Sequence, residues 1–88
     1  MLQGTTKSGF EFDVKEDNLD DYVLLKKLSA VSKGESGKIV DVIEMLLGDE
    51  QEEKLMNHIA ELHDGKVSAR AMIAEVKEIF EALKPKNS

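Results

Sequence analysis

The sequence predicts a mainly α-helical fold: a compact bundle of about four short helices, preceded by an N-terminal β-strand or hairpin. Two observations lead to this prediction. Residues 10–14 alternate between apolar and polar side chains, as in a half-buried strand. From about residue 18 onward, apolar residues recur instead at helical spacing, in four stretches separated by glycines and by residues that cap helices. With 88 residues, the chain is expected to form one domain over 1–84, with a frayed tail over 85–88.

The β element is predicted to span about residues 2–14. Phe10, Phe12 and Val14 share one face of the predicted strand, and the residues between them are charged. The segment Lys7–Gly9 is typical of a turn, so residues 2–6 could supply a hairpin partner. An isolated hairpin is only marginally stable in water, so its apolar face should pack on the helices or on another subunit.

The first two helices are predicted from their caps and their apolar faces. Asp17 or Asn18 is expected to cap a helix that continues to about residue 31. The second helix is expected from about Gly37 to Leu47, ended by Gly48, and its apolar residues cover so much of its surface that it should be the most buried.

Two further helices complete the predicted bundle. The third begins at Asp49 and ends at Gly65, and the fourth is capped by Ser68 and stopped by Pro85. The fourth has a broad apolar face, formed by Met72, Ile73, Val76, Ile79, Phe80 and Leu83.

The composition argues against several classes of function. Twelve basic and 18 acidic residues give a net charge of −6, which is unfavourable for binding nucleic acid or an anionic membrane. No apolar run approaches the 18 residues of a membrane span, and the first nine residues do not resemble a secretory signal. The chain has no cysteine, which excludes disulfides and thiolate metal sites.

Three short motifs resemble ligand sites but lack essential residues. The segment 32–38 lacks the first glycine and the final hydroxyl residue of a phosphate-binding loop. The segment around Gly65 places apolar residues at ligand positions of a calcium loop. His58 and His63 are five residues apart, so one helix cannot direct both at one metal, and we expect both to be solvated. We therefore predict no catalytic, cofactor-binding or metal-binding residues, and no enzymatic activity.

The apolar faces are the most informative features. We predict that part of them binds a protein partner, through a set of five residues: Phe10, Phe12, Met72, Val76 and Phe80. The alternative is that these side chains form the core, which is the more frequent role of an apolar stripe.

Several segments together resemble a known family. KSGFEFDV, DNLDDY, a leucine-rich helix, MLLGDEQ, DGKVS and EIFEAL, between about Lys7 and Leu83, are similar to the small tail assembly chaperones of long-tailed phages and prophages of Gram-positive bacteria. These motifs are strands, caps and amphipathic faces rather than catalytic signatures.

The resemblance implies a non-enzymatic role in the cytoplasm of the bacterial host. Such proteins bind the tape-measure protein, and in some cases tail-tube subunits, during tail assembly, and are absent from the mature virion. A homo-oligomer is compatible with so small a core. The alternative function is a small acidic phage-encoded regulatory or anti-host protein that binds a host protein through its acidic face.

Overall fold

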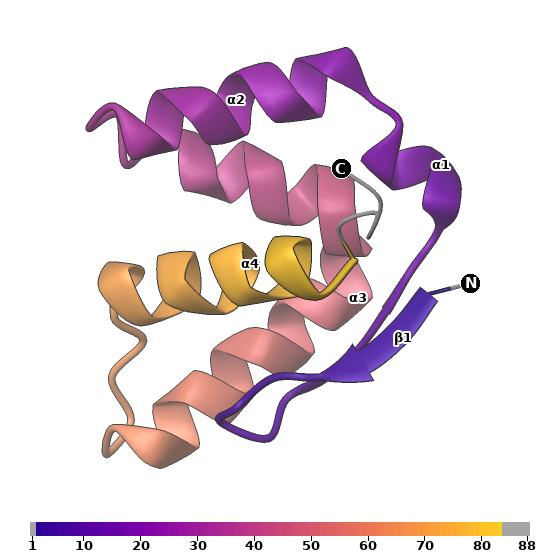
Figure 1. The fold of residues 1–88 in the computed structure, drawn as a ribbon. Coiled ribbons are helices and arrows are strands. Elements are labelled where there is room, and N and C mark those ends of the chain that lie inside the picture. Colours follow the sequence, from indigo (N-terminus) through magenta and orange to yellow (C-terminus); the bar gives the residue numbers. More distant parts are fainter. Residues whose placement is uncertain (1, 84–88) are drawn as a thin grey trace.

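The computed structural model describes residues 2–83, and it confirms the predicted fold class. A two-stranded antiparallel hairpin precedes four helices in this part of the chain (Figure 1). The elements are β1 (Leu2–Thr5), β2 (Glu11–Val14), α1 (Glu16–Leu19), α2 (Tyr22–Ser32), α3 (Lys38–Leu62) and α4 (Ala69–Leu83). The predicted stop at Pro85 and the predicted tail over 85–88 lie outside the described residues.

The hairpin forms where the alternating pattern predicts it, and its turn includes Lys7–Gly9. The N–H of Thr6 donates to the Phe10 carbonyl at 2.9 Å, and the N–H of Gly9 donates to the Thr6 carbonyl at 3.0 Å. Gly9 has a φ of 100°, a conformation that only glycine adopts without strain. A three-residue loop with glycine at its last position is a common hairpin connection.

The start of the first long helix differs from the prediction. The expected cap at Asp17 or Asn18 is wrong, because these residues lie within the four-residue helix α1. The cap of α2 is Asp21, whose Oδ1 accepts hydrogen bonds from the N–H groups of Val23 at 2.9 Å and Leu24 at 3.3 Å. The chain is non-helical at Asp20, so α1 and α2 are separate elements.

Helix α3 bends at Gly48, where the sequence predicts one helix to end and another to begin (Figure 1). Gly48 has a φ of 81° and a ψ of 166°, a region open almost only to glycine. A break of this kind removes helical partners from preceding carbonyls. Side chains replace those partners: the Asn18 amide donates to the Leu46 carbonyl at 3.1 Å, and the Gln51 amide donates to the Leu47 carbonyl at 3.0 Å.

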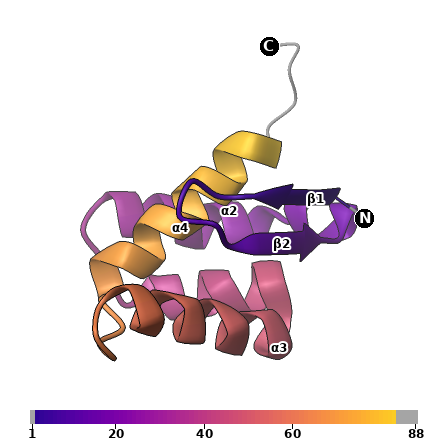
Figure 2. The same ribbon diagram turned by 90° about the horizontal axis from the view of Figure 1, so that it is seen from below.

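The core lies between the hairpin and helices α2, α3 and α4. In Figure 2, β2 lies on the α3 side of the hairpin, and β1 forms the strand farther from α3. Both halves of α3 contribute buried side chains, so the bend wraps this helix around the core. The buried apolar residues are Phe10, Phe12, Val14, Leu24, Val31, Ile39, Val42, Ile43, Leu46, Leu47, Leu55, Ile59, Met72, Val76 and Ile79.

Candidate functional site

The structure separates the five residues predicted to bind a partner. Phe10, Phe12, Met72 and Val76 are at most 7 % exposed and belong to the core. Phe80 is half-buried, on the same face of α4 but one turn beyond Val76. A partner that meets the folded chain can therefore reach Phe80 directly, whereas the other four are covered by the chain itself.

Phe80 lines an open groove of about 630 Å³, which we call the α2–α4 groove. Its apolar lining comes from α4, from α1 and α2, and from the first strand: Leu2, Leu19, Leu25, Leu28, Phe80 and Leu83. Leu25 is 49 % exposed although it belongs to a helix whose other face is in the core. Such an accessible apolar surface is typical of a site that another molecule covers.

Acidic residues border the α2–α4 groove. Glu16, the first residue of α1, and Asp20, which follows the last residue of α1, line it together with Glu81 of α4. Glu16 and Asp20 are exposed, and no basic residue is among the described residues that line the groove. The arrangement is therefore suited to an apolar segment that carries basic side chains at its margin.

A polar cluster that the sequence analysis missed fixes the hairpin turn to two helices. Glu75 of α4 is 7 % exposed, and its carboxylate accepts hydrogen bonds from the hydroxyls of Thr6 and Ser8, both at 2.8 Å. The Ser8 hydroxyl also lies 3.1 Å from Nε2 of His58 on α3. The backbone N–H of Lys7 donates to the Glu78 carboxylate. The turn is thus bound to α3 and α4 by side chains that are far from it in sequence.

The cluster does not have the geometry of a catalytic triad, although it brings a serine, a histidine and a glutamate together. In a triad, the acid binds the histidine nitrogen opposite the one that faces the serine. Here the carboxylate of Glu75 contacts the serine hydroxyl itself, and Nε2 of His58 lies between that hydroxyl and the Ser8 carbonyl, each at 3.1 Å. The histidine ring also packs on Phe10, with 5.9 Å between the ring centroids. The expectation that His58 is solvated is therefore wrong, and its role is to support the turn.

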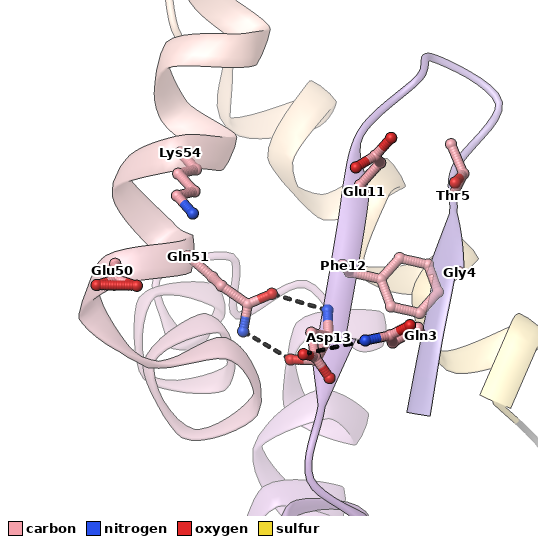
Figure 3. A pocket seen from close by; sticks show the side chains of 9 residues that line it. All are labelled: Gln3, Gly4, Thr5, Glu11, Phe12, Asp13, Glu50, Gln51 and Lys54. Atoms are coloured by element: carbon pink, nitrogen blue, oxygen red, sulfur yellow. Dashed lines mark hydrogen bonds between the residues drawn. The ribbon is translucent and has the colours of Figure 1, made fainter. Parts of the chain in front are cut away.

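A second hollow, of about 660 Å³, lies between the hairpin and α3 (Figure 3). At its edge, the side-chain amide of Gln51 pairs with the backbone of Asp13, accepting from its N–H at 2.8 Å and donating to its carbonyl at 2.7 Å. Gln51 therefore makes on the outer edge of β2 the contacts that a neighbouring strand would make. The aromatic ring of Phe12 lies over Gly4, where an added Cβ would come within 2.6 Å of it (Figure 3).

Three carboxylates meet on α3 around the bend. Oxygens of Glu44, Asp49 and Glu52 lie within 4.8 Å of one another, and burial, followed by the charges of the other two groups, raises the pKa of Glu52. Carboxylate oxygens are suitable ligands for hard cations. Glu44 and Asp49 are exposed, however, and exposed acidic groups are often close together without binding an ion.

Comparisons with known proteins add no assignment. The chain matches no protein-family model, no curated protein and no solved structure. Among the helices of residues 2–83, none combines the length and the apolar content that crossing a lipid bilayer requires.

Proposed function

We propose that this chain is a non-enzymatic tail assembly chaperone, which binds an amphipathic helix of a tape-measure protein in the α2–α4 groove. The observation that carries the proposal is the exposed apolar lining of this groove beside an acidic margin. The resemblance of the segments between Lys7 and Leu83 to tail assembly chaperones supports it independently.

The chemistry of the groove defines the kind of segment it would accept. An amphipathic helix places an apolar stripe on one face, and such helices bind in apolar grooves through residues spaced three and four apart. Leu25, Leu28 and Phe80 would contact this stripe, because they line the groove on α2 and α4. Lysine or arginine beside the stripe would lie near Glu16 and Asp20. The bound helix would lose the apolar surface through which it could aggregate.

Co-purification with the candidate partner tests the proposal. The chain is co-expressed with the tape-measure protein of the same phage or prophage, and capture is compared between the wild type, Leu25→Glu and Val23→Glu. Both residues are on α2, and they are 49 % and 51 % exposed, but only Leu25 lines the groove. We expect Leu25→Glu to weaken binding by about tenfold or more, because it places a charge against the apolar stripe, and Val23→Glu to bind as the wild type does.

Two results would contradict the proposal. Failure of the folded wild-type chain to capture the tape-measure protein would remove the proposed partner. Equal binding by Leu25→Glu and Val23→Glu would show that the groove is not the binding site. Salt separates the chaperone from the alternative, an acidic protein that binds a host factor: an apolar contact persists at about 1 M NaCl, whereas a contact between exposed charges is lost.

A further inference from the structure

The outer edge of β1 presents unpaired backbone groups. In an antiparallel pair, residues that face each other either bond to each other or direct their N–H and carbonyl groups away on opposite sides. Gln3 faces Asp13, and both backbone groups of Asp13 bond to Gln51, outside the hairpin. The N–H and carbonyl of Gln3 must therefore also point out of the hairpin, on the other side.

The same alternation applies to the next outward position of β1. The bond from the Thr6 N–H to Phe10 shows that this pair is of the bonded kind. The preceding pair, Thr5 with Glu11, is therefore of the outward kind. Within residues 2–83, no hydrogen bond satisfies the outward backbone groups of Gln3 or Thr5.

The two edges of the hairpin differ in how well they are protected against pairing with a strand of another chain. The amide of Gln51 occupies the edge of β2 at Asp13 (Figure 3). The edge of β1, whose residues are Leu2, Gln3, Gly4 and Thr5, has no charged residue and no proline, and among residues 2–83 no side chain bonds to its outward backbone groups as Gln51 does on β2. Charges, prolines and coverings are the usual means by which a sheet edge avoids pairing with another chain. Figure 2 shows β1 on the side of the hairpin away from α3.

We propose that β1 pairs antiparallel with β1 of a second copy of this chain. The outward residues are two apart, so a two-fold axis beside Gly4 places Gln3 of each copy opposite Thr5 of the other. All the outward backbone groups of these residues are then satisfied, and the two hairpins form one four-stranded sheet. The facing side chains are uncharged or absent, so no like-charged side chains repel each other at this contact, although each copy has a net negative charge.

A second copy suits this edge because one register satisfies both strands at once. Gly4 has no side chain, so the two backbones can approach closely at the axis. The contact is short, so the dimer should dissociate on dilution. Leu2 belongs both to β1 and to the lining of the α2–α4 groove, so the dimer would place two grooves next to the shared sheet. The dimer does not depend on the proposed function, since its contacts are backbone groups outside the groove.

Two proline variants test the pairing. Thr5 and Glu11 face each other, and the N–H of each points out of the hairpin, so neither Thr5→Pro nor Glu11→Pro removes a bond between β1 and β2. Thr5→Pro removes a donor from the proposed interface, whereas Glu11→Pro makes the same kind of change on the other edge. Sedimentation velocity from about 10 μM to about 1 mM should show dimers for the wild type and Glu11→Pro, and monomers for Thr5→Pro.

Amide hydrogen exchange of the wild type gives a second measurement that does not depend on folding of the variants. Exchange at Gln3 and Thr5 should slow by about tenfold or more between the dilute and concentrated samples, while exchange at Glu11 stays constant. The proposal is overturned if the wild type remains monomeric throughout this range. It is also overturned if a dimer forms without added protection at Gln3 and Thr5, or if folded Thr5→Pro dimerises as the wild type does.

Discussion

We expect Gln51→Ala to lower the free energy of unfolding by about 2–3 kcal/mol. The Gln51 amide makes three hydrogen bonds: from the Asp13 N–H at 2.8 Å, to the Asp13 carbonyl at 2.7 Å and to the Leu47 carbonyl at 3.0 Å. The substitution removes all three and leaves three backbone groups without a protein partner. It thereby removes the two hydrogen bonds between β2 and Gln51 of α3 and leaves a carbonyl at the Gly48 bend unsatisfied.

The magnitude follows from the number and burial of these bonds. A hydrogen bond within a protein contributes about 0.5–1.5 kcal/mol net, so three contribute about 1.5–4.5 kcal/mol. Gln51 is only half-buried, and water can reach some of the exposed partners, which places the expected loss in the lower half of this range. Alanine is a slightly better helix former than glutamine, which offsets the loss by a few tenths of a kcal/mol at most.

Urea unfolding, followed by circular dichroism, measures the effect. Glu53→Ala is the matched control: it is an exposed position on the same turn of α3, and we expect a change within about 0.5 kcal/mol. Gln51→Glu should be at least as harmful as alanine at neutral pH, because a carboxylate can accept from Asp13 but cannot donate to the two carbonyls. If Gln51→Ala unfolds within about 0.5 kcal/mol of the wild type, the claim that this amide joins β2 to α3 is wrong.

Three further predictions concern the backbone at two glycines, the buried side chain of Glu75 and the partly buried side chain of Glu52. Gly48→Ala should lower the free energy of unfolding by about 1–3 kcal/mol, because residues with a side chain rarely adopt its φ of 81° and ψ of 166°. Gly37→Ala should raise it by about 0.4–1 kcal/mol, because Gly37 has a φ of −63° and open space around it. Thermal unfolding compares the two variants. Glu75→Ala should cost about 3 kcal/mol in urea unfolding, because two hydroxyls lose a charged acceptor, and Glu75→Gln should cost less. Burial and neighbouring carboxylates raise the pKa of Glu52, so the folded chain binds this proton more tightly than the unfolded chain, and the charged group opposes folding at neutral pH. Glu52→Gln should therefore stabilise at pH 7, and this gain should disappear as the pH falls below the ordinary value of 4.5; equal gains at both pH values would contradict this reasoning.

The sequence predicts local features better than it predicts which neighbours they meet. The alternation at Phe10 and Phe12 and the glycine at 48 are local signals, and the structure has a strand and a helix break at these places. The sequence places the cap of this helix at Asp17 or Asn18 instead of Asp21, because aspartate and asparagine at any of these positions can cap a helix. A tertiary contact decides between them: Asn18 binds the Leu46 carbonyl, 28 residues away.

The candidate site depends more than the secondary structure does on contacts between residues that are far apart in the sequence. Val76 and Phe80 share one apolar face, and periodicity cannot show that the first is fully buried while the second borders a groove. The local sequence indicates that Glu75 is an exposed charged residue on a helix, because the hydroxyls that bind it are 67 and 69 residues away in the sequence. Thr6 and Ser8 are small polar residues at a predicted turn, and nothing in the local sequence indicates that their hydroxyls bind a buried carboxylate.

The attachment of the hairpin turn has a consequence for synthesis on the ribosome. The hairpin is translated before the helices, so the side chains that bind its turn, His58, Glu75 and Glu78, are translated much later than the turn itself. An isolated hairpin is marginally stable, so Phe12 of β2 and Phe10, which precedes that strand, stay accessible to other molecules until α4 has emerged. The hairpin is thus synthesised before the helices but is fixed only after them, and slowing translation between residues 60 and 78 would lengthen the time during which the chain is exposed to aggregation.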